Sequence, residues 1–360
     1  MKKLVHVVES FASGVFTFLT ELCNSTWDVY DITVIYSTRC ETPENFKDFF
    51  NKDIRFIKLD MCRGLDPGKN LKSLIELYSI LKEIHPDVVH LHSSKAGFLG
   101  RVVCFMLRLD MDNVFYNPHG YSFLQINESR LKTSTYYLLE KLAAAFGGWT
   151  VGCSSGEYLQ ASKISRRCLN INNGIDTVYI DKIISREALK KRGNKIILGT
   201  MGRICHQKNP TLFNAVADKL PQYDFIWIGD GELRSELTSE NILITGWLDR
   251  EKALEKLAEI NIFILTSLWE GMPLSLLEAM YMGKPVIASN AYGNRDIVQH
   301  GVYGYSAEKL EDYLEFICLI NQNGTFYLEA ESNYILVHYN KSKMVQSYLE
   351  LYENNKVRVI

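Results

Sequence analysis

Two glutamates, Glu270 and Glu278, lie within the stretch TSLWEGMPLSLLEAMYMGKPVIAS, and seven residues without a basic side chain separate them. A strand expected over 262–265 ends just before Glu270, which places this carboxylate in the loop at the strand's carboxyl end. A helix expected over 274–282 follows Pro273, a residue that suits the first turn of a helix. The N-terminus of such a helix carries free N–H groups and partial positive charge, so it predicts an anion site.

A carboxylate beside a bound anion is repelled unless it accepts hydrogen bonds from other groups, and sugar hydroxyls are suitable donors. The pair therefore predicts a ligand with a diphosphate at the helix N-terminus, a hexose at one glutamate and a ribose at the other. This is the composition of a nucleotide sugar. The alternative is an ordinary helix whose glutamates cap it or face solvent.

A second loop, GTMGRICHQKNP, follows the strand expected over 195–200. Gly202 permits a tight turn there, and Arg203 and Lys208 project from the loop. Arginine and lysine are common partners of a diphosphate. Two solvated loop cations are the alternative interpretation.

Two further loops follow strands of the first half of the chain. In NPHGYSF, His119 comes after the strand expected over 114–117 and points toward a cleft, although a lone histidine is more often structural. Gly14 comes directly after the first strand, and Ser13-Gly14 opens a helix. This is the usual position for backbone contact with a ligand.

The elements that position these loops alternate between short β-branched runs and longer amphipathic ones. The chain has 360 residues, which is comfortable for two domains of about 150 to 200 residues. Such alternation predicts parallel sheets covered on both faces, with ligands at the carboxyl ends of the strands. Strands are expected over 4–8, 29–36, 54–59, 88–91, 114–117 and 150–153, then over 195–200, 224–228, 242–244, 262–265 and 285–288. Helices are expected over 14–26, 69–84, 95–108 and 131–147, then over 209–219, 231–239, 250–258 and 274–282, and the last part, 307–354, reads as helical.

Composition excludes several classes of protein. The formal net charge of −2 gives no support for nucleic-acid binding, and the eight cysteines are scattered without a metal-ligand spacing. Reduced cysteines in a cytosolic protein are therefore expected. No segment has the length of a membrane span, and the apolar run in MKKLVHVVES is too short for a signal peptide. We expect a cytoplasmic protein, with possible contact at the inner face of the cytoplasmic membrane.

Two local patterns resemble other sites. Asp110-Met111-Asp112 is a DxD sequence, a pattern that can bind a metal, but here it precedes a strand and is expected to be a loop. IGDGELR imitates a dinucleotide fingerprint, yet Arg234 stands where the third glycine should be. Hydride transfer is therefore not expected.

Together these segments resemble the family-4 retaining glycosyltransferases of the GT-B fold, of the type that assembles bacterial surface polysaccharides (O-antigen and capsule). The resemblance covers nearly the whole chain and includes the Glu270/Glu278 pair. It implies two doubly wound Rossmann-like domains that face one another across a deep cleft: an acceptor domain over 1–180, with a terminal helix at about 341–354 crossing back onto it, and a nucleotide-sugar domain over 181–340. The other segments that carry it are HLHSSKAGFLGR (90–101), NPHG (117–120), NNGID (172–176), MGRICHQKN (201–209), IGDGELR (228–234) and GW (246–247).

The resemblance also implies roles for single residues. Arg203 and Lys208 would hold the donor diphosphate and stabilise the leaving nucleotide, Glu270 would contact the hexose, and Glu278 the ribose. His119 would line the sugar site. Together with Arg203, Lys208 and Glu270 it would be a catalytic residue. The further donor contacts would come from Gly14, Gly202, Gly246, Trp247, Gly271, Met272, Pro273, Leu274 and Ser275, with the base near Gly246 and Trp247. Many relatives carry Gly-Gly where this chain has Ser13-Gly14.

The implied reaction is a retaining front-face transfer that needs neither a metal nor another cofactor. The donor would be a UDP-sugar that carries a hexose or an N-acetylhexosamine, and the acceptor a free or, preferably, lipid-diphosphate-linked saccharide. Basic residues dominate 161–192, with eight positive charges against three negative, which permits contact with an anionic membrane; a solvated linker is the alternative. FLGRVVCFMLRL (98–109) could add an apolar contact, although a core helix is the more usual reading. Two other functions remain open, an inactive GT-B subunit that binds a sugar nucleotide and a nucleotide-sugar 2-epimerase.

Overall fold

A computed structural model describes residues 1–62, 64, 66–125, 128–185, 187, 189, 195–323 and 329–354. The chain forms two compact units. Unit 1 contains Met1–Asn172 together with Met344–Ile360, and unit 2 contains Asn173–Lys343. All eight cysteines are free thiols, as the sequence predicts.

Unit 1 is built on a seven-stranded sheet with the order β3-β2-β1-β4-β5-β6-β7, in which every pair is parallel. The order of the strands reverses between β1 and β4, which makes this the topological switch point where ligands bind in such sheets. The strands are β1 (Lys2–Val8), β2 (Tyr30–Tyr36), β3 (Arg55–Lys58), β4 (Val88–His92), β5 (Val114–Asn117), β6 (Trp149–Gly152) and β7 (Cys168–Asn170).

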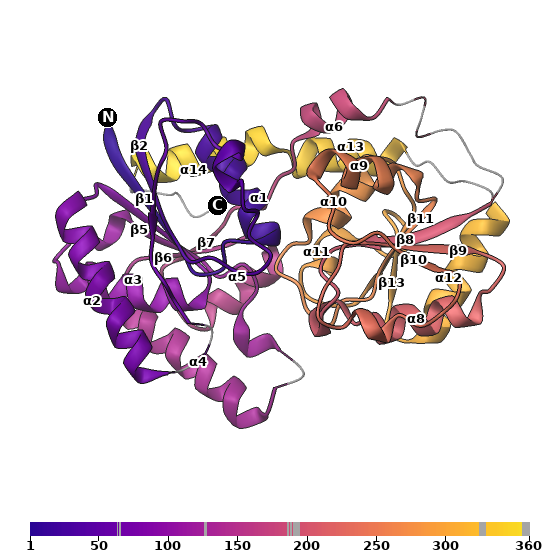
Figure 1. The fold of residues 1–360 in the computed structure, drawn as a ribbon, viewed down its shortest axis with the longest axis horizontal. Coiled ribbons are helices and arrows are strands. Elements are labelled where there is room, and N and C mark those ends of the chain that lie inside the picture. Colours follow the sequence, from indigo (N-terminus) through magenta and orange to yellow (C-terminus); the bar gives the residue numbers. More distant parts are fainter. Residues whose placement is uncertain are drawn as a thin grey trace. The chain divides into compact units, whose positions relative to one another are not determined.

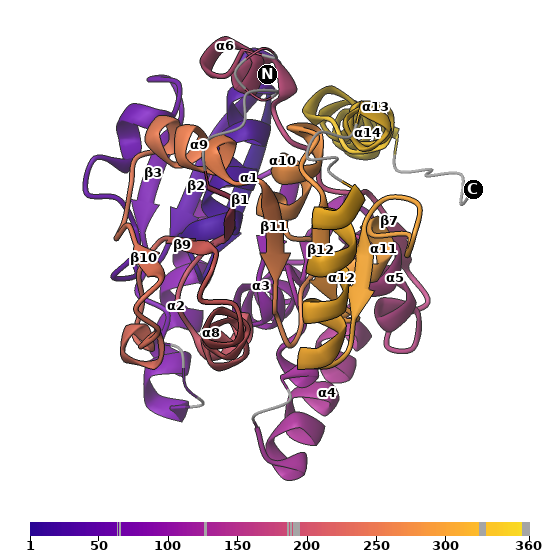
Figure 2. The same cartoon turned by 90° about the vertical axis from the view of Figure 1, so that its right-hand side faces the viewer.

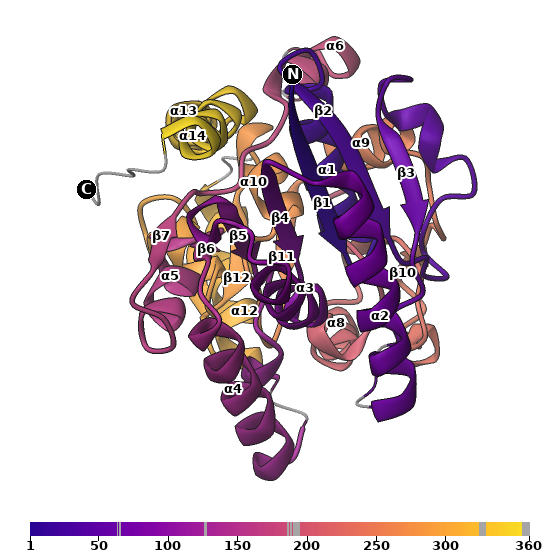
Figure 3. The same ribbon diagram turned by 90° about the vertical axis from the view of Figure 1, so that its left-hand side faces the viewer.

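Helices cover both faces of this sheet because the strands are apolar on both sides. On β1, Leu4 and Val8 pack with α1 and α14, whereas Val5 and Val7 pack on the opposite face with α2 and α3. Figure 1 shows α14 and α2 on opposite sides of the sheet, and Figure 3 shows α2 and α3 in front of it. The helices are α1 (Ser13–Asn24), α2 (Pro67–Ile84), α3 (Ser94–Met106), α4 (Arg130–Ala145), α5 (Ser155–Ser162) and α14 (Lys341–Asn354).

Unit 2 is built on a six-stranded sheet with the order β10-β9-β8-β11-β12-β13, also parallel throughout. Its switch point lies between β8 and β11. The strands are β8 (Ile197–Met201), β9 (Asp224–Ile228), β10 (Ile242–Ile244), β11 (Ile262–Leu265), β12 (Val286–Ser289) and β13 (Tyr305–Ala307).

The helices of unit 2 again lie on both faces of their sheet. Helices α8 and α12 share one apolar cluster with the sheet, and α9 and α10 lie on the other side (Figures 1 and 2). The helices are α6 (Thr177–Ile183), α8 (Pro210–Lys219), α9 (Arg250–Glu259), α10 (Leu274–Tyr281), α11 (Asn294–Ile297), α12 (Leu310–Asn323) and α13 (Glu329–His338).

The predicted α/β class with two doubly wound sheets is confirmed. One predicted element is wrong: the helix expected over 231–239 is only a short 3₁₀ turn, Arg234–Glu236. Gly231 lies against the neighbouring loop, since a β-carbon there would be 2.2 Å from the carbonyl oxygen of Ile204. The chain is therefore held in a loop at the point where the helix was expected to begin. The described residues of the helical stretch expected over 307–354 form three helices, and strands β7 and β13 had not been predicted.

Candidate active site

The candidate site of unit 2 is formed by the loops that follow β8, β9, β10, β11 and β12. In a parallel sheet these loops lie at one edge, and hydrogen bonds join them directly. The N–H of Leu268 donates to the carbonyl of Gln207 at 2.8 Å, and the N–H of Ile204 donates to that of Asp230 at 2.8 Å. Backbone hydrogen bonds therefore connect the loops after β8, β9 and β11.

Two glycines with positive φ allow these loops to approach one another closely. A β-carbon at Gly229 would be 2.3 Å from the carbonyl oxygen of Gly202, and one at Gly293 would be 2.5 Å from that of Gly271. Both positions have positive φ, +137° and +81°, so a side chain would also strain the backbone. The glycines of IGDGELR thus pack loop against loop, and Arg234 closes the motif with a 2.7 Å ion pair to Asp230.

Lys208 and Glu270 form an ion pair inside this cluster. The Lys208 Nζ lies 2.6 Å from the Glu270 Oε1, and the two side chains are only 15% and 8% exposed. Gln207 donates from its Nε2 to the Glu270 Oε2 at 3.2 Å and to the Trp269 carbonyl at 2.9 Å. Thr266 holds the lysine backbone by donating to the Lys208 carbonyl at 2.7 Å. Side chains of opposite charge therefore join the loops 199–210 and 266–273 directly.

Glu278 is buried in α10, with 1% of the residue exposed. Arg250, from the first turn of α9, forms an ion pair with its Oε1. The Oε2 has no hydrogen-bond partner among the residues that the structure describes. Arg250 was missed by the sequence reasoning, which had nothing to pair the start of one amphipathic helix with a glutamate of another.

The start of α10 supplies backbone donors to the same edge. Pro273 is its N-cap residue and forms no side-chain cap, so the first turn retains N–H groups without an intrahelical partner. The predicted residues Gly271, Met272, Leu274 and Ser275 lie on this segment. The loop after β12 contacts it through Gly293, a contact that no pattern in the sequence had indicated.

The remaining predicted residues of unit 2 lie on neighbouring loops. Arg203 is half-buried in the loop after β8. Gly202 lies beside the lysine, since a β-carbon there would be 3.1 Å from the Lys208 Cε. Gly246 has a φ of +72° and pairs with Gly229 in an isolated bridge, and the ring of Trp247 beside it is 55% exposed. An exposed indole at this edge can stack on a planar base.

At the carboxyl edge of the first sheet, three residues other than glycine have positive φ. These are Ser13 after β1 (+50°), Ser93 after β4 (+73°) and His119 after β5 (+54°). Such conformations are strained and gather at functional sites. Gly14 has an ordinary φ, and a β-carbon there would have no neighbour within 4 Å. Ser13 therefore adopts the conformation that favours glycine, at the position where many relatives have Gly-Gly.

His119 belongs to a group of histidines in unit 1. Its Nε2 lies 3.1 Å from the Nδ1 of His92, and its ring packs edge-on against Phe18 of α1, with centroids 4.9 Å apart. Burial, together with the nearby His90, lowers the pKa of His119 to about 3. The imidazole is therefore neutral at physiological pH.

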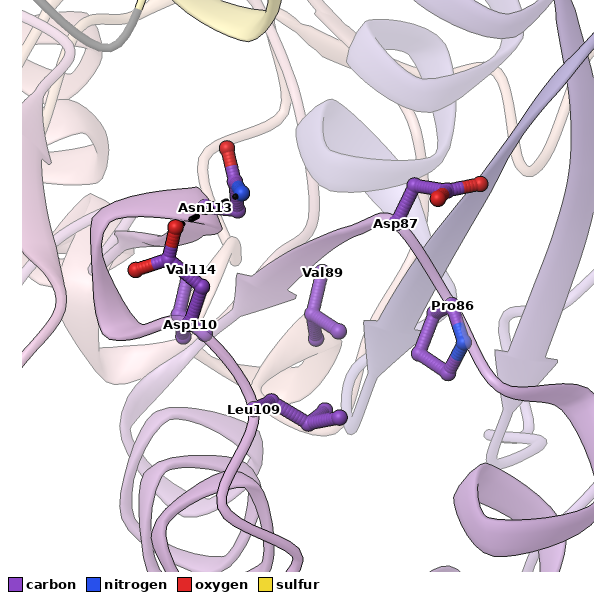
Figure 4. A pocket seen from close by; sticks show the side chains of 7 residues that line it. All are labelled: Pro86, Asp87, Val89, Leu109, Asp110, Asn113 and Val114. Carbon is purple, nitrogen blue, oxygen red and sulfur yellow. Dashed lines mark hydrogen bonds between the residues drawn. The ribbon is translucent and has the colours of Figure 1, made fainter.

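Both aspartates of the DxD sequence are paired with other residues of the protein. The Asp110 carboxylate accepts from the backbone N–H of Asp112 at 3.0 Å and from the side chain of Asn113 at 3.2 Å, while Asp112 forms an ion pair with Arg167. Figure 4 shows Asp110 and Asn113 at the wall of a pocket, whose other lining residues are Pro86, Asp87, Val89, Leu109 and Val114. This pocket lies at the amino ends of β4 and β5, opposite the edge that carries the candidate residues.

Comparison with known proteins identifies both halves of the chain. Residues 10–146 match the family described as "Glycosyl transferase 4-like", and residues 181–321 match "Glycosyl transferases group 1". The chain is 29% identical to the UDP-Gal:alpha-D-GlcNAc-diphosphoundecaprenol alpha-1,3-galactosyltransferase of Escherichia coli, with 90% of this chain and 89% of that protein covered. It is 28% identical to the O-antigen biosynthesis glycosyltransferase WbnH of E. coli, with coverages of 85% and 86%.

Among solved structures, Anabaena Alr3699/HepE in complex with UDP and glucose superposes with a TM-score of 0.76. The match covers 98% of this chain and all of that one, at 18% identity. At this identity the likeness concerns the fold, which is GT-B.

Proposed function

We propose that this chain, which belongs to the GT-B glycosyltransferases, transfers a hexose or N-acetylhexosamine from a UDP-sugar to a lipid-diphosphate-linked saccharide, with retention of configuration. The observation that carries the donor assignment is the Glu278 carboxylate. A buried, charged oxygen without a partner is costly, and within the described part of the chain only one of the two Glu278 oxygens is paired. The hydroxyls of a ribose supply the missing donors.

The other groups at this edge suit the remainder of a nucleotide sugar. Lys208 has three N–H donors, and its pairing with Glu270 leaves others for a phosphate. Arg203 and the uncapped start of α10 add positive charge for the diphosphate. Glu270 accepts hexose hydroxyls with its remaining lone pairs, and Trp247 offers an aromatic face to the base.

The proposed chemistry follows from where charge develops. Departure of UDP leaves negative charge on the β-phosphate and oxocarbenium character on the sugar. Lys208, Arg203 and the helix N-terminus stabilise the first, so the protein itself supplies the cations and we propose that no metal is required. The leaving phosphate then helps to deprotonate the acceptor hydroxyl on the same face, which retains the configuration of the sugar.

The acceptor assignment rests on the relatives. The E. coli galactosyltransferase acts, by its name, on a GlcNAc-diphosphoundecaprenol, and WbnH takes part in O-antigen biosynthesis. We propose an acceptor of the same class and a role in surface-polysaccharide assembly.

Such an acceptor lies in a membrane, and unit 1 carries a surface that suits one. No helix among the described residues is long and apolar enough to cross a bilayer. Helix α4, however, exposes Leu131, Leu138 and Leu142 along one stripe, with exposed fractions of 81%, 65% and 49%. Phe105 and Met106, at the end of α3, continue the stripe, since Phe105 contacts Phe146 just beyond α4.

The rim of this stripe is basic. Arg108, Arg130, Lys132, Lys141 and Lys163 are exposed on or just beyond α3, α4 and α5, and Lys132 forms an ion pair with Glu128. An apolar stripe with basic neighbours favours the interface of an anionic bilayer. Of the two segments first considered, 98–109 contributes only its exposed end to this stripe, because most of α3 is buried in the core. The basic run 161–192 contributes Lys163, and its residues Arg186, Lys190, Lys191 and Arg192 lie outside the described residues.

Sedimentation with phosphatidylglycerol vesicles, and with phosphatidylcholine vesicles as the uncharged counterpart, tests the α4 stripe. We expect binding to the anionic vesicles that falls several-fold in Leu131→Ser/Leu138→Ser. The matched control is Leu71→Ser/Ile75→Ser on α2, where both side chains are also more than half exposed. Equal loss in both double variants, or no binding by the wild type, would refute the membrane contact.

Calorimetry of the purified protein with UDP, GDP and their common sugars, with magnesium and with EDTA, tests the donor assignment. We expect UDP to bind in both conditions, and Glu278→Gln to weaken it about tenfold, since a hydrogen bond to a charged group is worth about 1.5–3 kcal/mol. Incubation of UDP-galactose with a synthetic GlcNAc-diphospho-lipid, followed by NMR of the new anomeric centre, tests transfer and stereochemistry.

The two alternatives give different results in these assays. An inactive GT-B subunit would bind UDP but transfer nothing to any acceptor. A nucleotide-sugar 2-epimerase would convert the donor in the absence of an acceptor. Arg203, Lys208, Glu270 and Glu278 are all present, which favours a catalyst over an inactive subunit.

A further inference from the structure

Four histidines lie on the side of the first sheet that α1 and α14 cover. His6 is on β1, His90 and His92 are on β4, and His119 follows β5. The register pairs His6 with His90 and Val8 with His92, so the first three occupy neighbouring positions on one face. None of these three has any exposed surface. Histidine is an uncommon residue to bury in such number, and the donor-site assignment gives His6 and His92 no role.

Hydrogen bonds link three of the rings into a chain that ends at His119. The His6 Nδ1 lies 3.0 Å from the His92 Nε2, and the His92 Nδ1 lies 3.1 Å from the His119 Nε2. The inner end, the His6 Nε2, is buried without a partner among the described residues. The outer end is the Nδ1 of the half-buried His119.

His90 stands beside this chain. Its Nε2 pairs with the Asn117 Oδ1 at 2.5 Å, and its Nδ1 pairs with the Tyr352 hydroxyl at 2.6 Å. The ligand atoms of His6, His90 and His92 lie within 4.8 Å of one another, a spacing that could surround a metal ion. An ion there would displace hydrogen bonds that already occupy both nitrogens of His90 and His92. The contacts therefore favour a row of hydrogen-bonded histidines over a metal site.

All of these rings are neutral at physiological pH. Burial holds the pKa of His6 and that of His92 well below the ordinary value, with neighbouring histidines adding to the effect. Burial also lowers the pKa of His90 to about 4. The groups that face the chain from other elements are Phe18 of α1, Tyr348 and Tyr352 of α14, and Glu157 of α5, which accepts from the Gly120 N–H at 2.6 Å.

A neutral imidazole carries a single N–H, so the chain has two concerted arrangements. In one, His6 donates from Nδ1 to His92, His92 donates from Nδ1 to His119, and His119 presents its own Nδ1–H at the edge of the sheet. In the other, every proton is on Nε2, and the His6 Nε2–H is buried without an acceptor. Orphaned buried N–H groups are rarer than orphaned acceptors, which favours the first arrangement.

We propose that His6 and His92 are positioning residues that hold His119 in the Nδ1–H tautomer, so that it presents a hydrogen-bond donor at the carboxyl edge of the first sheet. The catalytic consequence rests on the proposed contact of His119 with a sugar: a fixed donor recognises a hydroxyl oxygen without reorganisation of the ring. The tautomer itself does not depend on that function.

Long-range ¹H–¹⁵N NMR of the ¹⁵N-histidine-labelled full chain reads the tautomer directly. We expect one tautomer of His119 in the wild type, with the proton on Nδ1. His92→Phe interrupts the chain and should give a mixture of tautomers at His119. His92→Gln should retain the Nδ1–H form, because the amide oxygen can accept from His6 and the amide N–H can donate to His119. The matched control is His338→Gln, at an exposed position of unit 2.

A wild-type His119 with its proton on Nε2, a wild-type mixture, or a tautomer unchanged by His92→Phe would each overturn the inference. If His92→Phe fails to fold, the wild-type spectrum still decides. Turnover of UDP-galactose with the GlcNAc-diphospho-lipid adds a second readout, in which His92→Phe should lower kcat about tenfold and His92→Gln should restore most of it. Loss of the tautomer without loss of turnover would refute the catalytic role of His119, while the hydrogen-bonded row of histidines would still stand.

Discussion

The Lys208–Glu270 pair allows the structural and the catalytic roles of a buried ion pair to be separated. Among the described residues, Lys208→Met leaves Glu270 with Gln207 as its side-chain partner, in a site where only 8% of the glutamate side chain is exposed. Removal of one member of a fully buried pair costs about 3–5 kcal/mol. Because the lysine retains 15% exposure, we expect about 2–3 kcal/mol.

Unit 2 has the size at which 1 kcal/mol changes Tm by about 2–4 °C, so the melting temperature of Lys208→Met should fall by about 4–12 °C. The double variant Lys208→Met/Glu270→Gln removes both charges and should regain most of this loss. The control is the surface pair Lys195–Asp224, at 3.2 Å and with side chains 70% and 47% exposed. Lys195→Met should cost less than about 1 kcal/mol.

Activity should not follow stability. Both variants lack Lys208, which we propose as a cation that stabilises the leaving diphosphate, so both should lose about 10²–10³-fold in kcat. Thermal unfolding and steady-state transfer of the same samples give the two readouts. Recovery of turnover in the double variant would mean that Lys208 serves only to neutralise Glu270, and additive stability effects would mean that the pair is not coupled; either result refutes the reasoning.

Three further predictions concern unit 2. Gly293→Ala should reduce turnover and lower Tm, because residue 293 has a φ of +81° and the new methyl group would lie 2.5 Å from the carbonyl oxygen of Gly271. Normal turnover together with a normal Tm would contradict this close approach of the two loops. Burial lowers the pKa of Lys284 to about 8, so the stability of the protein falls as the pH drops from about 10.5 to 8. Lys284→Met, which also loses the hydrogen bond to Ala258, should raise stability at pH 7 by about 1–2 kcal/mol. A gain that persists unchanged at pH 10.5 would show that the buried charge is not its cause. Burial raises the pKa of Glu331 to about 7, so its contribution to folding stability is full below about pH 4.5 and is lost as the pH rises through 7. Glu331→Gln should therefore flatten the dependence of Tm on pH between 5 and 8, which thermal unfolding of both proteins across this range measures.

The sequence predicted the parts of this molecule that local patterning determines. The alternation of apolar runs specified two parallel sheets, and the position of each polar loop after a strand specified which edge would carry it. The helix predicted over 231–239 is wrong because a tertiary contact at Gly231 holds the chain in a loop there, although the amphipathic pattern of the segment suits a helix. Propensity describes a segment by itself, and this contact comes from the loop after β8.

The contacts that complete the candidate site were not predictable for the same reason. Arg250 reaches Glu278 from another helix, and Gly293 meets Gly271 from a loop after another strand. Neither pairing leaves a spacing in the sequence, because the intervening chain only has to return to the same edge of the sheet. The histidine chain is similar: His90 and His92 show a period of two, but His6 joins them only through the pairing of β1 with β4.

The two glutamates beside the proposed anion site therefore have different partners within the protein. Glu270 has both oxygens in contact with Lys208 and Gln207, so a hexose must share acceptors that are already in use. Glu278 has one oxygen held by Arg250, and the other has no partner among the described residues, so this oxygen is free of them to accept a hydrogen bond from a ligand. A pre-oriented carboxylate loses little side-chain entropy on binding. The ribose should consequently contribute more affinity than the hexose, and UDP alone should bind almost as tightly as the UDP-sugar; a UDP-sugar that binds more than a hundredfold tighter than UDP would place the main recognition at Glu270 instead.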